Sequence, residues 1–102
     1  MEDGNRMVCN FRSARNASMI DAIAEVESEA ETAQLRYGDF TSTHEALGVL
    51  AEEFSELIEA VRSNDLETIR SEAVQVSAVA LRLAAQCSLP IEAFRKRSGS
   101  EG

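Results

Sequence analysis

Apolar residues recur at helical spacing along three stretches of the chain, and short polar segments separate these stretches. Gly38 follows the first stretch, as glycine commonly does just past the end of a helix. Near the end of the chain, Pro90 suits the first turn of a further short helix. Together these patterns predict an all-α fold. The expected helices cover about residues 18–37, 43–62, 66–86 and 90–95.

Polar residues between the stretches match the signals that begin helices. Ser42 followed by Glu45 forms a capping box, in which the serine accepts from a backbone N–H and the glutamate reaches back. Asn64 or Asp65 can cap the next helix. These signals place two long helices in succession with a tight turn between them, and we expect the two to pack antiparallel.

The two long helices differ in how their apolar positions are distributed. The helix over 43–62 has one stripe, with Leu47 and Phe54 among its members, whereas the helix over 66–86 is apolar on two sides. Such a helix is central, or faces both a core and a partner subunit. We therefore expect an antiparallel helical bundle whose four-helix packing is completed by oligomerisation, as a homodimer or homotetramer. Cys87 continues the main stripe and is expected in the core.

Length and composition favour one small domain. The chain has 102 residues, is 44% hydrophobic, and contains one proline and no tryptophan. Close packing of aliphatic side chains must therefore form the core. We expect an N-terminal arm over residues 1–15, a single helical domain over 16–97 and a disordered tail over 98–102.

The charge balance argues against some classes of partner. The chain carries 18 acidic and 10 basic residues and a net charge of −8, which repels nucleic-acid phosphates. We expect no membrane association, because no apolar run is long enough to span a bilayer and no signal peptide is evident. Cys9 and Cys87 lie far apart without metal-ligand spacing, which favours reduced thiols in a cytoplasmic protein.

Acidic and amide residues recur three positions apart on both long helices, a spacing that puts them on one helix face. Glu53 and Glu56 form one such pair, and Glu72 and Gln75 form the other, while Glu52 points mostly outward. Glu53 and Glu72 lie at the edges of apolar stripes, where a lone carboxylate is costly. A metal, an arginine or water could compensate. Oxygen ligands from two facing helices suit a hard cation such as Mg²⁺.

Two further side chains have more than one interpretation. Gln75 is either a neutral amide ligand or a residue hydrogen-bonded to Glu72 or Arg82. Arg82 either contacts a substrate phosphate or forms a salt bridge with an acid on a neighbouring helix. His44 has no suitably spaced partner, so we do not expect a zinc site.

Residues 37–83 resemble the MazG-like family of all-α nucleoside triphosphate pyrophosphohydrolases. The resemblance rests on residues 37–40 (YGDF), 44–48 (HEALG) and 51–57 (AEEFSEL), and it continues into Glu72. It implies a MazG-like bundle in which acidic residues of two antiparallel helices hold Mg²⁺, with Mn²⁺ able to substitute. The matching positions are Glu52, Glu53, Glu56, Glu72 and Gln75.

The resemblance also implies an activity. The metals would hold a nucleoside triphosphate while an activated water releases pyrophosphate and a nucleoside monophosphate, with Glu52 or Glu53 as the base. Such an enzyme would clear non-standard or excess nucleotides. Gln75 stands where the family normally has an aspartate, which lowers the charge of the site. The alternatives are a helical binding or assembly module with a degenerate, weakly or non-catalytic metal site, or a regulatory partner protein.

Overall fold

The computed structural model describes the backbone of residues 2–89 and the side chains of residues 15–89. Residues 2–89 contain three helices and no strand, which confirms the all-α expectation. The helix expected over 90–95 and the tail expected over 98–102 lie outside the described residues. The helices are α1 (Glu2–Tyr37), α2 (Thr43–Ser63) and α3 (Leu66–Cys87).

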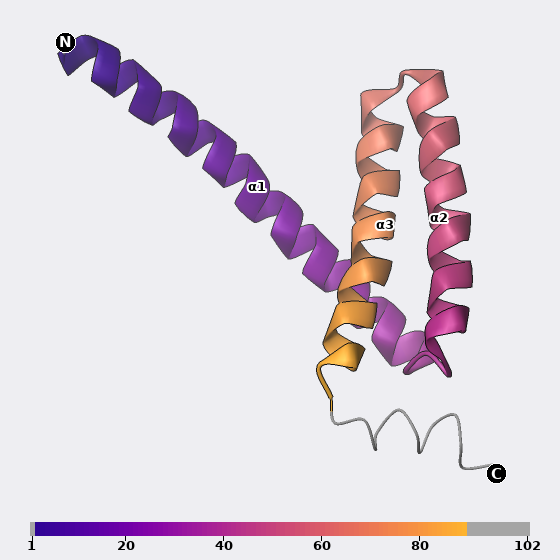
Figure 1. Ribbon diagram of the computed structural model, residues 1–102. Helices are drawn as coiled ribbons and strands as arrows, with labels where there is room; N and C mark the ends of the chain where they lie inside the picture. Colours follow the sequence, from indigo (N-terminus) through magenta and orange to yellow (C-terminus); the bar gives the residue numbers. More distant parts are fainter. Residues whose placement is uncertain (1, 90–102) are drawn as a thin grey trace.

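Helices α2 and α3 lie side by side as an antiparallel hairpin, and α1 crosses α3 at an angle (Figure 1). The N-terminal half of α1 extends away from the hairpin (Figure 1). Helix α3 contacts both other helices, whereas the backbones of α1 and α2 do not approach each other within the described part of the chain. Helix α3 is thus central among the three, in agreement with its two apolar sides.

The first helix is longer than its sequence pattern indicates. The pattern predicts a start near Ser18, and this prediction is wrong, because α1 begins at Glu2. Residues 2–17 contain one glycine and no proline, so little in the local sequence opposes a helix there. Apolar periodicity detects a helix face that packs on something, not helix formation as such. The domain boundaries after residues 15 and 97 remain predictions.

The connector between α1 and α2 carries the signals that the sequence predicts. Gly38 takes a φ of 75°, in the left-handed region that glycine adopts at low cost. Ser42 caps α2, since its Oγ accepts from the Glu45 N–H at 3.1 Å. The Glu45 carboxylate accepts from the Thr41 N–H at 2.7 Å. The capping serine is therefore confirmed, and the returning glutamate bonds one residue earlier than in the usual capping box.

The turn between α2 and α3 reverses the chain within two residues. Asn64 has a φ of 62°, and its N–H donates to the Val61 carbonyl at 3.1 Å. Asp65 then caps α3 by accepting from the Glu67 N–H at 3.3 Å, and the Thr68 hydroxyl donates to the same carboxylate at 2.5 Å. These bonds confirm the expected bounds of α2 and α3 to within about one residue.

The core is small and lies where the connector packs on the hairpin. Phe40 of the connector, Ala46 of α2 and Val79 of α3 are buried together. The connector thus closes the end of the hairpin at which α2 begins and α3 ends. Half-buried residues that pack against this group are Val49, Leu50 and Leu83.

Two polar side chains of α3 hold the connector in place. Gln86 is buried; its Nε2 donates to the Phe40 carbonyl at 2.8 Å, and its Oε1 accepts from the Phe40 N–H at 2.9 Å. Arg82 donates from Nη2 to the Gly38 carbonyl at 2.9 Å and from Nε to the Gln34 side-chain oxygen at 3.2 Å. The Arg82 guanidinium also lies 4.4 Å from the centroid of the Phe40 ring. Backbone polar groups of an irregular segment are satisfied in this way.

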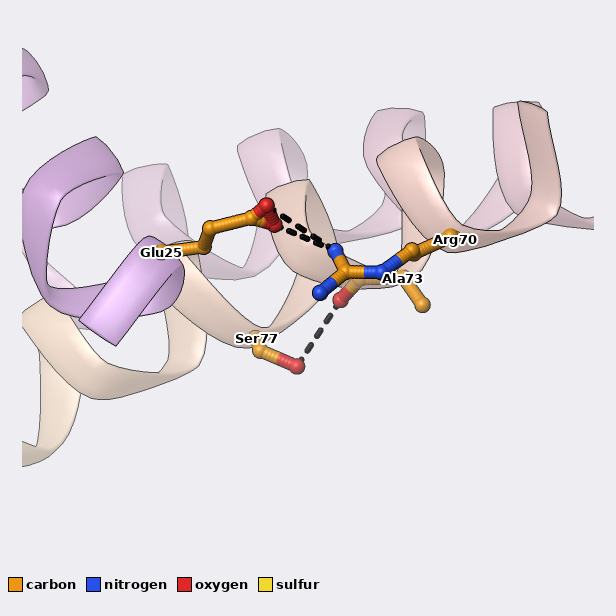
Figure 2. A network of polar contacts seen from close by, with 4 residues as sticks. All are labelled: Glu25, Arg70, Ala73 and Ser77. Atoms are coloured by element: carbon orange, nitrogen blue, oxygen red, sulfur yellow. Dashed lines mark hydrogen bonds and ion pairs between the residues drawn. The ribbon is translucent and has the colours of Figure 1, made fainter. Parts of the chain in front are cut away.

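An ion pair joins α1 to α3. Arg70 of α3 donates from Nη1 to both carboxylate oxygens of Glu25 in α1, with the Oε2 contact at 3.0 Å (Figure 2). Both side chains are about half exposed, so water competes and the pair contributes little to stability. Close to it, the Ser77 hydroxyl donates to the Ala73 carbonyl within α3 (Figure 2). Among the side chains described in α1, only that of Ala30 is buried.

Much of the apolar stripe predicted on α2 is not covered. Leu47, Phe54 and Val61 are 59%, 54% and 52% exposed. They are seven residues apart and follow one line along the helix. Leu50 and Leu57, on the adjacent edge, are half-buried. The stripe is wider than the seam that a single neighbouring helix covers, and this leaves one line of apolar side chains exposed.

The expectation that Cys87 lies in the core is wrong. Its side chain is exposed at the last residue of α3. The neighbouring Gln86 is buried instead, because the connector packs against that side of the helix. Successive helical residues point about 100° apart, so the two side chains cannot share one face. The position of the connector decides this outcome.

Candidate metal centre

Three carboxylates meet across the hairpin of α2 and α3. Glu53 and Glu56 stand about one turn apart on α2, and Glu72 comes from α3. One oxygen of each lies within 4.8 Å of the oxygens of the other two. The three-residue spacing puts the two α2 acids on one face, and the tight turn sets the register of α3 against them. The structure therefore brings together the three acids that the sequence indicates as metal ligands.

The carboxylate of Glu72 is the least satisfied of the three. Its Oε1 is buried and has no hydrogen-bond partner within the described part of the chain. Burial raises the pKa of Glu72 above the ordinary 4.5, and the charge of Glu56 and a hydrogen bond with that side chain raise it further. A hydrogen bond between two carboxyl groups requires a proton on one of them. A bound cation could take the place of that proton.

Glu53 is held in a similar environment. It is half-buried, and burial is the main cause of its raised pKa. Neither ion pair of the described residues, Arg62–Glu59 or Arg70–Glu25, includes a member of the cluster. Within the residues whose side chains are described, 15–89, compensation by an arginine, which the sequence left open, is thus not formed. Neighbouring carboxylates raise the pKa of Glu53 further, in the order Glu56, Glu72, Glu52 and Glu29.

The donor set suits a hard divalent cation. Mg²⁺ holds oxygen ligands at about 2.0–2.1 Å in an octahedron, so two ligand oxygens lie at most roughly 4.2 Å apart. The observed limit of 4.8 Å is slightly wider, and a small rotation of the exposed Glu56 side chain would close the difference. The cluster consists of carboxylates alone, without the imidazole or thiolate ligands that zinc prefers.

A pocket of about 620 Å³ opens beside the cluster, bounded by the C-terminal part of α1, the connector, α2 and α3. Glu53 belongs both to the cluster and to the pocket wall, whereas Glu56 and Glu72 do not line the pocket. Glu52, which is exposed, and Gln75 line the pocket without belonging to the cluster. A molecule in the pocket would therefore meet a bound cation at Glu53.

Gln75 is half-buried, and its side chain forms no hydrogen bond with any described residue. The hydrogen bond to Glu72 or Arg82 that the sequence allows is not formed among the described residues: Glu72 Oε1 has no partner, and Arg82 donates to Gln34 and Gly38. The amide oxygen is thus available as a neutral ligand, a role that remains a prediction. Arg82 also lines the pocket, and its hydrogen bonds go to neutral groups, not to an acid on a neighbouring helix, as one interpretation of the sequence allowed.

Two residues of α1 at the pocket were not indicated by the sequence. Glu29 and Arg36 both line it, and the charge of Glu29 contributes to the raised pKa of Glu53. Glu29 is half-buried. The crossing of α1 over α3 brings these residues to the pocket, and no signal within α1 encodes that crossing (Figure 1).

Comparison of the chain with protein-family models, with curated proteins and with solved structures finds no match. No helix within residues 2–89 combines the length and the apolar character needed to cross a bilayer. The likeness to the MazG-like family therefore remains a prediction from the sequence motifs. The carboxylate cluster and the pocket beside it are the structural observations from which a function can be argued.

Proposed function

We propose that this chain is a Mg²⁺-dependent, MazG-like hydrolase that converts a nucleoside triphosphate into a nucleoside monophosphate and pyrophosphate. The observation that carries the proposal is the meeting of the Glu53, Glu56 and Glu72 oxygens within 4.8 Å. These carboxylates would hold the cation, with the amide oxygen of Gln75 as a neutral ligand. Mn²⁺ takes the same kind of oxygen donors and would substitute.

The pocket beside the cluster supports a small-molecule substrate. Its volume of about 620 Å³ lies within the range of about 300–1,000 Å³ that is common for ligand sites. Carboxylates such as Glu52 and Glu53 line it, and alone they would repel a triphosphate. A divalent cation at the cluster would reverse the charge at the point where Glu53 meets the pocket. The acidic wall is thus compatible with a phosphorylated substrate only when the cation is bound.

The residues at the pocket suggest how the reaction could proceed. A bound cation would neutralise phosphate charge and lower the pKa of the attacking water. Glu52 and Glu53 are the candidate bases. Glu52 lies outside the cluster, so a cation held there would leave its carboxylate free to accept a proton from that water. Addition of the water across the bond between the first and second phosphates gives the monophosphate and pyrophosphate.

Release of pyrophosphate from a panel of ribo- and deoxynucleoside triphosphates, with and without Mg²⁺, tests the proposal. We expect metal-dependent turnover, and Glu72→Gln should weaken Mg²⁺ binding by ~10-fold or more. Glu59→Gln is the matched control, because it removes the same charge from an exposed position on α2. No turnover by the native chain, together with no Mg²⁺ binding in calorimetry, would refute the proposal.

A helical binding or assembly module with a degenerate metal site is the second candidate, and Gln75 favours it. An amide contributes no charge, so the cation is held by fewer negative ligands than in a site with an aspartate there. Gln75→Asp separates the two candidates. If the native chain is a degenerate module, this substitution should create turnover that the native chain lacks. Turnover by the native chain with Gln75 in place rejects degeneracy.

We also infer that a second copy of the chain covers the exposed apolar line of Leu47, Phe54 and Val61. The seven-residue spacing of this line suits helix-on-helix packing, and the small core of one chain leaves it open. Size-exclusion chromatography with light scattering should give two or four times the chain mass of 11.1 kDa. Phe54→Glu should shift the protein to monomer. A native chain found only as monomer contradicts this inference.

A further inference from the structure

Two arginines line the pocket beside the carboxylate cluster, and their surroundings differ. Arg82 is half-buried and already engaged. Its Nη2 donates to the Gly38 carbonyl and its Nε to Gln34, while its guanidinium lies 4.4 Å from the centroid of the Phe40 ring. Contacting a ligand with these donors would require releasing the connector that they hold.

Arg36 differs from Arg82 in both exposure and hydrogen bonding. It lies in the last turn of α1 and is exposed. Its guanidinium forms no hydrogen bond or ion pair within the described part of the chain, and its one aromatic contact is with Tyr37, 5.9 Å from the ring centroid. The five N–H donors of this guanidinium are therefore available to a ligand.

Because the pocket wall is mostly acidic, the difference between an engaged and an available arginine affects how a phosphate could bind. Helix α2 contributes Glu45, Glu52 and Glu53 to the wall, and α1 contributes Glu29 together with Arg36. A cation at the cluster neutralises phosphate charge only close to Glu53. Phosphate oxygens farther from it need positively charged donors to offset the acidic wall. Arginine suits this task, because its planar fork matches two phosphate oxygens at once.

We infer that Arg36 binds the phosphate oxygens of the substrate, and that Arg82 is a positioning residue that holds the connector between α1 and α2. The inference rests on the proposed function. It moves the phosphate contact from α3, where the sequence placed it, to the C-terminal end of α1. The contact is then made from α1, a different helix from the one that contributes Glu52 and Glu53 to the pocket.

Binding of inorganic tripolyphosphate in saturating Mg²⁺, measured by calorimetry, tests the inference without requiring turnover. Arg36→Gln should weaken binding ~10-fold or more, because charge-assisted hydrogen bonds are lost. Arg36→Lys should weaken it by roughly a few-fold, since lysine keeps the charge but not the fork. Arg62→Gln is the control: it removes the same charge from an exposed arginine of α2 that pairs with Glu59, and binding should stay unchanged.

Loss of the Arg36 contact, loss of the Arg82 contacts and loss of the metal site would each give a different experimental result. Arg36→Gln should bind Mg²⁺ like the native chain in the absence of phosphate. Arg82→Gln should lower the Tm while the folded protein keeps its affinity for tripolyphosphate. If Arg36→Gln binds tripolyphosphate as well as the native chain, or if Arg82→Gln loses that binding with its Tm unchanged, the inference is overturned and the metal site stands. If the native chain binds no Mg²⁺, the proposed function fails and the inference fails with it.

Discussion

The hairpin of α2 and α3 and the long helix α1 differ in how far local sequence signals specify their arrangement. In the hairpin, Ser42 and Asp65 cap the two helices, Asn64 closes the first of them, and the turn sets their register. Helix α1 has a local signal at its C-terminal end, Gly38, but no turn that sets its register against α3. It meets the rest of the chain through α3 and the connector, and its N-terminal half extends away from both (Figure 1).

This difference shows which part of the candidate site is robust. The three carboxylates of the cluster come only from the hairpin, so local signals suffice to bring them together. The pocket needs α1 as well, because Glu29 and Arg36 line it. Metal binding should therefore be less sensitive to the placement of α1 than binding of a phosphate ligand. Four predictions test this division.

The largest effect is expected at the junction between the two regions. Gln86→Leu leaves the buried N–H and carbonyl of Phe40 without partners, which should cost about 3 kcal/mol of unfolding free energy. Urea denaturation followed by circular dichroism measures it. At a pH low enough to keep the introduced acid protonated, Gln86→Glu retains both a donor and an acceptor for Phe40 and should give a smaller loss. Equal stability of Gln86→Leu and the native chain would show that the connector is held by packing alone.

The next effect concerns stabilisation of the hairpin by metal. At a Mg²⁺ concentration of 100 times Kd, binding to the folded state should add about 2.7 kcal/mol. Glu72→Gln should lose most of this gain, whereas Glu59→Gln should retain it, because Glu59 is exposed and outside the cluster. Thermal unfolding with and without Mg²⁺ measures the gain. An equal gain in Glu72→Gln would exclude the cluster as the metal site.

A third effect is the pH dependence of the metal-free hairpin. The pKa values of Glu53 and Glu72 are raised in the folded state, so the folded state binds their protons more tightly than the unfolded state does. At a pH below the ordinary pKa of 4.5, these acids do not lower the free energy of unfolding. As the pH rises from 4.5 through the raised pKa values, the metal-free protein loses stability.

The double variant Glu53→Gln, Glu72→Gln isolates this contribution from that of other acids. Its stability relative to the native chain should increase as the pH rises through this window, by roughly a few degrees in Tm. Mg²⁺ should remove the difference, and its binding to the native chain should release protons. A constant difference between the variant and the native chain from acid to neutral pH would contradict the raised pKa values of Glu53 and Glu72.

The smallest effect is expected at the ion pair between α1 and α3. Glu25→Gln removes the partner of Arg70, and a half-exposed pair of this kind contributes about 0–1 kcal/mol. A double-mutant cycle with Arg70→Gln in low and high salt measures the coupling, which should fall as salt rises. Coupling well above this range would mean that the ion pair, and not the connector, fixes α1 on α3.

The hairpin could be predicted from the sequence because its signals are local. The capping residues Ser42 and Asp65 and the left-handed Asn64 act on backbone groups within a few residues. The spacing of Glu53 and Glu56 puts both on one face of α2 wherever that helix lies. Glu72 could be expected opposite them because a tight turn leaves antiparallel helices little choice of register.

The remaining features could not be predicted, since they depend on segments distant in the sequence. Cys87 is exposed and Gln86 buried because the connector packs on one side of α3. Arg82 contacts the Gly38 carbonyl and the Phe40 ring, and not the acids of the site, because the connector packs on the same side of α3. Glu29 reaches the pocket because α1 crosses α3.

The sequence by itself determined the all-α class, the bounds of α2 and α3 and the convergence of three carboxylates. Only the tertiary structure decided the path of α1, the pocket that it helps to form and the different environments of Arg36 and Arg82. The physical reason is the separation in sequence over which each interaction acts. Caps, turns and helical spacing act between neighbouring residues, whereas a crossing of two helices depends on contacts between residues about 45 positions apart, as Glu25 and Arg70 are.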